Sequence, residues 1–544
     1  MRPSCNATGP GHGALYCGAP RPDAVGRRVW EHAGAGMRWS CPWAVCRNPN
    51  AQAGHIEHFP MADEFQDIRL KQDLTSRPLA ATLIGMAAPI AAGTILQSAY
   101  ALVNAYWLGK AGTTALAAPG AASPFQFIAV AFGMGFANAG TALVAQFTGA
   151  KQYERAERAA AQTILVLCSL ITVAAVPMVA CTPQLLNLFR VPQEAMPEAT
   201  AYLRIVLIGL PISAFTMAYG GVLRAVGDTV TVIVILAVAN IANAALDPFL
   251  IFGWVGLPRM GVRGAALGTV ICQTAAALAC YGCLRRGRSG LNIKRADWKP
   301  DWPLIWKTLT VGLPAAIGGS STSFGFALQQ SMVNTLGVVV MAAFTIGFRV
   351  IHVLDVPVQA MASATAPIVG QALGAGKRKL ARQAAWTSAI WVAAIMFLPL
   401  AFVTWQRHLV AGLFAQTPEV VEEAAKFFLL VPVSSYFFGV FMVLTSAFVG
   451  SGHTMPTMIL AVVRLWVLRI PLVYLFAFVL HMGSTGIYTG MALANVFSAG
   501  IALMMFFGIR WESAVVALPA RQEEPAVSEV SPERTPRSGL EPGA

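Results

Sequence analysis

The chain has 544 residues, of which 56% are hydrophobic and only 12% are charged, and its formal net charge is +13. About a quarter of the residues in an ordinary soluble domain are charged, so this composition excludes a soluble globular protein. Apolar stretches long enough to cross a hydrocarbon core of roughly 30 Å as helices recur along most of the chain. Each span must be a helix, because lipid offers no partners for backbone N–H and C=O groups.

The N-terminal stretch 1–60 is rich in Gly, Pro, His and Arg and contains no apolar run, so it does not form a signal peptide. The stretch MADEFQDIRLKQDLTSRPLAATLIG, beginning at Met61, is typical of a chain start that leads into a first span. We therefore interpret 1–60 as an extension upstream of the natural initiator and expect 1–77 to be disordered. Four of the nine cysteines lie in this extension, and their spacings fit no zinc pattern: Cys5, Cys17, Cys41 and Cys46.

The apolar stretches predict an all-α polytopic membrane protein with twelve transmembrane helices. In chain order the spans cover 82–108, 119–147, 157–182, 199–224, 229–254, 262–284, 303–335, 341–372, 383–405, 424–449, 455–480 and 485–510. We expect an N-terminal six-helix lobe at 78–284, a cytoplasmic linker at 285–302, a C-terminal six-helix lobe at 303–510 and a disordered tail at 511–544.

Lys and Arg concentrate in alternate connections between the spans. The basic connections contain Lys151, Arg155 and Arg158; Arg285, Arg286, Arg288, Lys294, Arg295 and Lys299; and Lys377, Arg378, Lys379 and Arg382. This positive-inside pattern places both termini in the cytoplasm and the chain in the inner (plasma) membrane. A nucleic-acid-binding patch is the alternative explanation of the charge, and the alternation argues against it, so we expect no nucleic-acid partner.

The two halves of the chain resemble each other at one constant separation in the numbering, which we call the repeat offset. It pairs Pro89 with Pro314, Gly112 with Gly337, Gln146 with Gln371, Gly149 with Gly374, and GDT at 227–229 with GHT at 452–454. Six spans per repeat return the chain to its starting side, so the two lobes share one orientation and are related by a pseudo-two-fold axis along the membrane normal. Transporters built in this way bind substrate near the midplane and alternate access between the two sides.

Asp247 is a carboxylic acid inside the predicted fifth span. A charged group at mid-bilayer is costly and is a functional-site hypothesis by default; a hydrogen bond to a neighbouring helix is the structural alternative. Asn243 lies one turn before it on the same helix face, with Asn240 a further step back. Pro248 frees a backbone carbonyl beside the acid. Because burial favours the protonated form of a carboxyl group, this position suits an acid that exchanges protons.

A second acid inside a span, Asp355, forms a possible second polar site with His352 and Gln329. His352 lies three residues before Asp355 and could pair with it, and Arg349 extends the same face. A neutralised structural cluster explains this pattern as well as a coupling site does. No Cys, His or carboxylate grouping has metal-ligand spacing, so we expect no metal, no cofactor and no catalytic residues. Pro89, inside the first span, is either a static kink or a moving hinge.

Several segments resemble, in order, those of the multidrug and toxic compound extrusion (MATE) family. They are GMAAPIAAGTILQSAYALVNAYWLGKAGTTALAA with ALVAQFTGAKQYERA, then VLRAVGDT, ANIANAALDPFLIFG, GVRGAALGT, VGLPAAIGG, IVGQALGAGK and RLWVLRIPLVYLF. The resemblance covers 78–510. It implies a V-shaped, two-lobed antiporter that exports amphipathic, often cationic organic compounds in exchange for H⁺ or Na⁺ and works as a monomer.

The resemblance also assigns roles to individual residues. Asn243 and Asp247 match the Asn and Asp of the family's fifth helix that serve its N-lobe cation site, and Thr269 matches a residue of that network. Pro89 matches a first-helix proline associated with bending. Asn104 stands where many members have a second Asp, which leaves Asp247 as the main titratable group of the lobe.

The C-terminal lobe departs from the family pattern. Spans 303–335 and 424–449 lack interior carboxylates, and Asp355 stands where the family is usually apolar. These departures favour proton coupling over sodium and a position nearer the DinF-type than the NorM-type branch. Two alternatives remain: a flippase for lipid-linked precursors, which would need cationic residues such as Arg349, Arg464 or Arg469, and an intramembrane enzyme, for which only His352 with Asp355 could serve.

Overall fold

The computed structural model describes residues 73–188, 193, 196–256, 258–287, 290–415 and 417–516. The expectations for 1–72, including Met61 and the four N-terminal cysteines, and for 517–544 lie outside these residues and stay predictions. All described residues belong to one compact unit, Pro60–Ala544.

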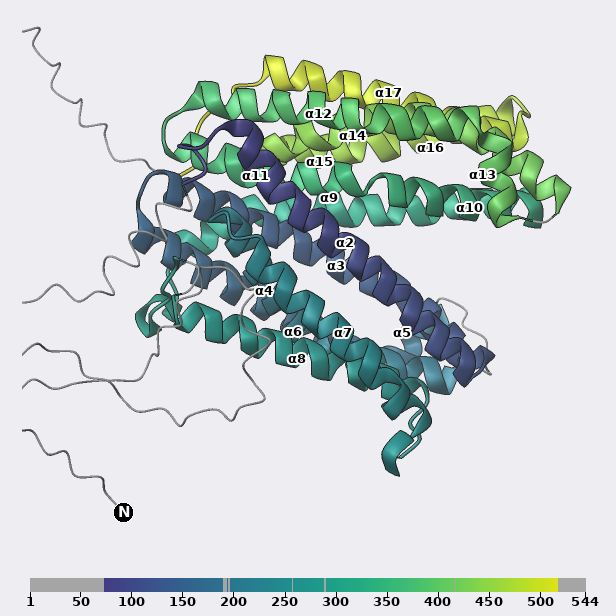
Figure 1. Cartoon of the computed structure of the whole chain (residues 1–544), viewed down its shortest axis with the longest axis horizontal. Coiled ribbons are helices and arrows are strands. Elements are labelled where there is room, and N and C mark those ends of the chain that lie inside the picture. Colours follow the sequence, from purple (N-terminus) through teal and green to yellow (C-terminus); the bar gives the residue numbers. More distant parts are fainter. Residues whose placement is uncertain are drawn as a thin grey trace, which may run out of the picture. The chain divides into compact units, whose positions relative to one another are not determined.

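Helices make up every regular element of the described residues (Figure 1). The N lobe contains α2 (Leu79–Ala111), α3 (Thr113–Gly149), α4 (Tyr153–Ala180), α6 (Met196–Ala225), α7 (Val230–Phe252) and α8 (Val262–Arg285). The C lobe contains α9 (Trp302–Asn334), α10 (Val338–Leu354), α11 (Val356–Gly374), α12 (Arg378–Trp405), α14 (Pro418–Ser451) and α17 (Gly483–Gly508). A composite helix over Thr454–Val479 precedes α17, so each of the twelve predicted spans coincides with a helix or a helix pair.

Length and apolarity alone qualify 10 of the described helices as membrane spans, or 11 when a bent pair counts as one. The predicted span that falls outside this set is α9, which contains the polar run GGSSTS and two adjacent glutamines. The bent pair is α10 with α11, which meet at Asp355 with an angle of 45°. Because Pro357 cannot donate a backbone hydrogen bond, the span predicted over 341–372 is divided into two helices at this junction.

The composite helix contains two π-helical turns, η4 (Val463–Arg469) and η5 (Leu475–Val479), separated by α16 (Ile470–Tyr474) and preceded by α15 (Thr454–Val462). Two short helices, α5 (Thr182–Leu188) and α13 (Arg407–Phe414), were not predicted because segments of this length give no periodic signal. The prediction of a disordered tail from 511 onward is wrong for 511–516, because Trp511 and Val516 are buried. Leu74, within the predicted N-terminal disorder, is buried as well.

The helix boundaries confirm the repeat. Helix α3 begins at Thr113 and ends at Gly149, and the pair α10–α11 begins at Val338 and ends at Gly374, so both ends are related by the repeat offset. The same offset relates α4 to α12 at both ends and the start of α5 to the start of α13. Gly112 and Gly337 both have positive φ, at 136° and 99°, at the turn after the first helix of each lobe.

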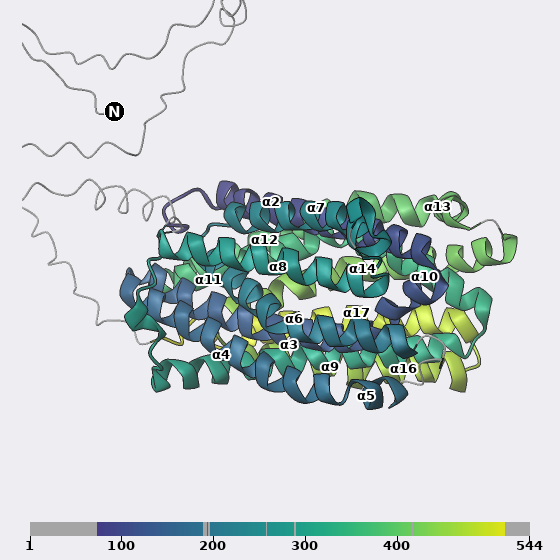
Figure 2. The same cartoon turned by 90° about the horizontal axis from the view of Figure 1, so that it is seen from below.

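The first helix of each lobe packs against the other lobe. Helix α2 contacts α7 of its own lobe and α11 of the C lobe, and α9 correspondingly contacts α15 and α3 (Figures 1 and 2). At their C-terminal ends α3 and α11 touch directly. A Cβ on Gly149 would overlap the backbone of Gln371, and one on Gly374 would overlap the backbone of Gln146. Glycine therefore permits this close approach between the lobes.

Gln146 and Gln371, which we call the glutamine pair, join the lobes at this crossing. Gln146 Nε2 donates to Gly450 O at 3.2 Å, and Gln371 Nε2 donates to Ala225 O at 2.8 Å. The remaining oxygen of each side chain accepts backbone N–H groups of a terminal segment: Gln146 from Val515 and Val516, and Gln371 from Leu74. These bonds explain why 511–516 and Leu74 are ordered.

Candidate functional site

Asp247 lies in the interior of α7 with an exposed fraction of 0%. Neither of its carboxylate oxygens has a hydrogen-bond partner among the described residues. Asn243, one turn earlier, and Ile251, one turn later, are buried on the same face, and α7 continues as a helix through Pro248. The acid therefore points into the packed side of α7, which contacts α2 and α8, and not toward lipid.

A hydroxyl and amide network adjoins the acid. Asn243 Nδ2 donates to Tyr100 Oη and, at 3.2 Å, to Thr269 Oγ1. Asn104 Nδ2 donates to the same Tyr100 Oη at 3.3 Å, and Thr269 Oγ1 donates to Ala265 O at 3.0 Å. The predicted residues Asn104, Asn243 and Thr269 thus meet, although they come from α2, α7 and α8.

Tyr100 is the member that the sequence analysis missed. Its hydroxyl connects Asn104 of α2 with Asn243 of α7, which lies 143 residues from Tyr100. The available signal was its position four residues before Asn104, on the same face of α2. A tyrosine in an apolar span is an ordinary residue of a membrane protein, so the sequence offered no reason to single it out.

The unpaired atoms of the site are all oxygens. Asn104 Oδ1, Asn243 Oδ1 and both oxygens of Asp247 are buried without a donor among the described residues. Asp247 Oδ1 and Asn243 Oδ1 face the same point on α8, at 3.0 and 3.2 Å from the position that a Cβ on Gly268 would occupy. Buried acceptors without donors are costly, and a proton on the acid or a hard cation among these oxygens would remove that cost.

No group of three or more His, Cys, Asp and Glu side chains suitable for a metal occurs in the described part of the chain. Pro89 is half-buried within α2, which continues as a helix on both sides of it. It lies three helical turns before Tyr100, about 16 Å along a helix axis, so its expected hinge role would act on the site through the helix and not by contact.

The possible second site does not assemble as one cluster. Asp355 is buried at the α10–α11 junction with Oδ1 unpaired, whereas His352 is exposed. No hydrogen bond or ion pair between the two side chains occurs among the described residues. Gln329 is buried in α9, where its Nε2 donates to Met491 Sδ at 2.9 Å, and it has no bond to Asp355.

Two arginines of the composite helix are buried in the C lobe. Arg464 and Arg469 are each 4% exposed, and Nε of both and Nη1 of Arg464 have no hydrogen-bond partner within the described ranges. Arg464 Cζ lies 5.0 Å from the Phe438 ring centroid and 5.3 Å from that of Phe441. Arg469 Cζ lies 5.1 Å from the Phe326 centroid. These cation–π contacts stabilise the charges only in part, so the C lobe has a cationic, aromatic interior that the sequence analysis had not emphasised.

A duplicated bundle of apolar helices, with a carboxylate that has no partner among the described residues, has the architecture of a membrane transporter. The MatE family model matches residues 89–249 and 314–475, two segments whose starts are separated by the repeat offset, and the chain belongs to this family of multi-pass membrane transporters. The family match identifies a transporter and not an enzyme. The family resemblance seen in the sequence is thereby confirmed, whereas its assignment to the DinF-type branch stays a prediction.

The chain is similar over most of its length to two curated transporters. It is 24% identical over 455 residues to the probable multidrug resistance protein NorM of Thermotoga maritima, covering 81% of this chain and 95% of that protein. It is 26% identical over 437 residues to the FAD transporter of Shewanella oneidensis, covering 78% and 94%. A solved outward-facing MATE transporter of the MOP superfamily shares the fold, with TM-score 0.74, 23% identity and coverage of 81% and 97%.

Proposed function

We propose that the chain is an efflux antiporter that exports amphipathic, cationic organic compounds across the inner membrane and takes up H⁺ in exchange. The observation that carries the proposal is the buried carboxylate of Asp247, whose two oxygens lack partners among the described residues. The name of the Thermotoga maritima relative supports multidrug export. The protein would have both termini in the cytoplasm, as the basic connections indicate. It would work as a monomer.

In this proposal the charge of Asp247 changes during each cycle. The ionised acid holds a cationic compound that enters from the cytoplasm or the inner leaflet. A proton arriving from the outside then neutralises the acid, which weakens its attraction for the cargo and satisfies one of the unpaired oxygens of the site. Because one inward proton replaces one outward monovalent cation, the exchange moves no net charge and the pH gradient drives it: one pH unit provides about 1.4 kcal/mol, which corresponds to about tenfold accumulation per proton.

Proton coupling is preferred to sodium coupling because the site offers one carboxylate. The oxygens of Asn243 and Asn104 could complete a sodium shell, so both ions fit the chemistry of the site. Transport into everted vesicles, measured with a proton gradient and a sodium gradient imposed separately, distinguishes them. Uptake driven only by the sodium gradient would replace H⁺ by Na⁺ in the proposal.

The central test is Asp247→Asn in everted vesicles, with a fluorescent cationic dye added to the outside medium and its transport into the vesicles measured. Because the amide cannot exchange a proton at neutral pH, we expect proton-driven dye transport to be abolished while membrane expression stays normal. Asp355→Asn is the matched variant, as it neutralises a second buried acid of the helical bundle and should retain transport. Unchanged transport by Asp247→Asn, or loss confined to Asp355→Asn, would refute the assignment.

A second candidate function, export of aromatic organic anions, is favoured by Arg464 and Arg469. Their buried, unpaired nitrogens lie among phenylalanine rings, and the Shewanella oneidensis relative is named as an FAD transporter. A flippase of lipid-linked precursors would depend on the same two arginines, because Arg349 is exposed. Comparing the transport of an aromatic cation, a flavin dinucleotide and a polyprenyl diphosphate by one vesicle preparation identifies which of the three is the substrate.

A further inference from the structure

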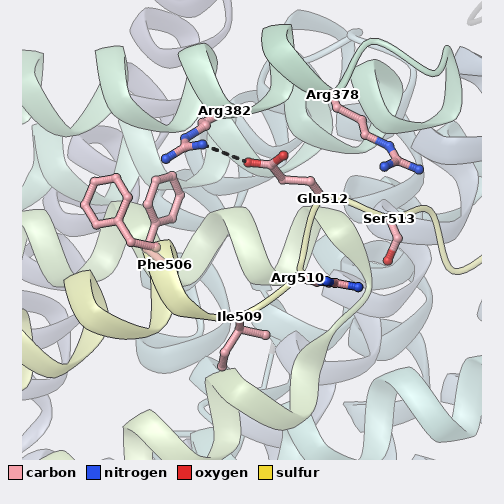
Figure 3. Close-up of a pocket in the computed structure, with 8 residues that line it drawn as sticks. Arg378, Arg382, Phe506, Ile509, Arg510, Glu512 and Ser513 are labelled. Carbon is pink, nitrogen blue, oxygen red and sulfur yellow. Dashed lines mark ion pairs between the residues drawn. The ribbon is translucent and has the colours of Figure 1, made fainter.

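A basic cavity lies at the end of the C lobe where α12 begins and α17 ends. It has a volume of about 470 Å³ and is lined by Arg378, Arg382, Arg510 and Glu512, with Ser513 and Ile509 beside them (Figure 3). Arg382 Nη1 lies 3.8 Å from Glu512 Oε1, the one ion pair of the cavity among the described residues. Arg378 and Arg510 are exposed and have no acidic partner in that part of the structure, so the cavity keeps an excess of positive charge.

The segment that completes this cavity is held in place by a buried tryptophan. Trp511 is 0% exposed, its Nε1 donates to Phe506 O at 3.0 Å, and its ring lies 5.0 Å from that of Phe506 and 6.1 Å from that of Phe448. The neighbours of Trp511 in the sequence, Arg510 and Glu512, are therefore fixed at the cavity.

An apolar cavity of about 510 Å³ continues from the basic one. The two cavities share Arg382, Phe506 and Phe507, and the second adds Lys379 and Trp386. Arg382 Cζ lies 5.4 Å from the Phe507 centroid, and the rings of Trp386 and Phe507 meet edge to face at 5.8 Å. Although aromatic, both residues are largely exposed, with fractions of 42% and 57%, so they line an open apolar surface.

Basic residues are followed by an aromatic residue along one face of α12. Arg378, Arg382 and Trp386 are spaced by four residues and share that face. Two such steps along a helix rise by about 12 Å, which is on the scale of the zone between lipid phosphate and upper acyl chain. With the predicted topology, the basic groups would lie at headgroup depth and the exposed aromatic rings deeper in the bilayer, the order in which an anionic phospholipid presents its phosphate and its chains.

The repeat does not require this arrangement. The residues of the N lobe that correspond to Arg378, Lys379, Arg382 and Trp386 at the repeat offset are Tyr153, Glu154, Glu157 and Ala161. Glu157 instead accepts the backbone N–H of Asn292 at 3.0 Å and fixes the linker between the lobes. The basic and aromatic face is thus particular to the C lobe.

We propose that this double cavity binds one anionic phospholipid, with its phosphate between Arg378, Arg382 and Arg510 and an acyl chain against Trp386 and Phe507. Arginine binds phosphate oxygens through two parallel N–H groups, and basic pockets beside membrane helices recognise anionic headgroups. A free phosphate would use only the basic half of the site. The inference is independent of the transported substrate and of the coupling ion.

The test measures lipid retention by native mass spectrometry of the full chain purified in detergent. Phosphatidylglycerol, phosphatidylcholine and glycerol 3-phosphate are added separately at equal concentrations. We expect phosphatidylglycerol to be retained at least about tenfold more than the other two. Each surface arginine contributes about fivefold, so Arg378→Gln with Arg510→Gln should reduce its retention by more than tenfold.

The matched control is Arg285→Gln, because Arg285 is the repeat counterpart of Arg510 at the end of α8 and is also exposed; it should retain the lipid. Trp386→Ala should weaken phosphatidylglycerol retention without creating affinity for glycerol 3-phosphate. If the double variant does not fold, the single variants should each show about a fivefold loss. Equal retention of both phospholipids, or glycerol 3-phosphate binding as tight as lipid, would overturn the proposal.

Discussion

At the scale of single residues, the site around Asp247 depends on the absence of a side chain at Gly268. Gly268 lets the backbone of α8 approach the acid, and both Asp247 Oδ1 and Asn243 Oδ1 face the space that its missing side chain leaves free. Small residues commonly allow such close helix approach in membranes. Here the space adjoins unpaired oxygens, so we infer that it is where an arriving proton or cation is accommodated.

Gly268→Ala places a methyl group in that space and should reduce coupled dye transport at least about tenfold, which corresponds to a loss of roughly 1.4 kcal/mol of ion binding. Gly282→Ala, on the same helix but with no heavy atom within 4 Å of the added Cβ, should transport like the unmodified protein. Initial transport rates in everted vesicles measure both. Normal coupling in Gly268→Ala would show that the space is not used.

At the scale of elements, the composite helix gives the C lobe its cationic interior. Its π-helical turn η4 begins just before Arg464 and ends at Arg469, and both side chains are buried. Such turns are rare and occur frequently at functional sites. Leu465, between the arginines, lies so close to Gly325 of α9 that a Cβ there would overlap it. The tight contact between these helices keeps the two guanidinium groups among aromatic rings.

Arg464→Met tests whether that buried charge serves function. A buried unpaired charge is costly, and an apolar replacement of similar volume is often neutral or stabilising, so we expect a Tm at least as high as that of the unmodified protein. Efflux of aromatic anions should fall at least about tenfold while cation efflux is retained. Arg349→Gln, an exposed arginine of the same lobe, is the control for both measurements. A lowered Tm with unchanged anion efflux would indicate a structural arginine.

At the scale of the whole molecule, the glutamine pair closes one end of the interface between the lobes. Its bonds run from the N lobe to Gly450 and from the C lobe to Ala225, and both glutamines also hold a terminal segment. With the predicted topology this end faces the cytoplasm, so the bonds would have to break for cargo to enter from that side. Alternating access would therefore require Gln146 and Gln371 to separate from their partners.

Replacing both by leucine should favour the state that is open at this end. A net hydrogen bond contributes about 1 kcal/mol, so each replacement should raise the open fraction by roughly fivefold. Spin labels at Arg155→Cys and Gly508→Cys, in a background without native cysteines, report the distance between the lobes. Gln359→Leu on α11 is the exposed control. A distance distribution that is unchanged in the double variant would exclude this role of the pair.

The sequence alone determined that this is a membrane protein, and it also determined the twelve spans, the internal repeat and the isolation of Asp247 in an apolar helix. These features are local: composition, apolar length and the position of one acid are properties of contiguous residues. Asn243 and Thr269 followed from helix spacing and family resemblance, and the structure brings them together with Asn104.

Only the tertiary structure decided which side chains meet. Tyr100 joins the site through a partner 143 residues away, and Gln371 bonds Ala225 across 146 residues. The bend at Asp355 and the exposure of His352 likewise depend on packing between helices and not on the helix that contains them. Helix–helix contacts in lipid are set by close packing and hydrogen bonds with no hydrophobic force to favour one face, so the sequence pattern fixes the helices but not the surfaces by which they meet.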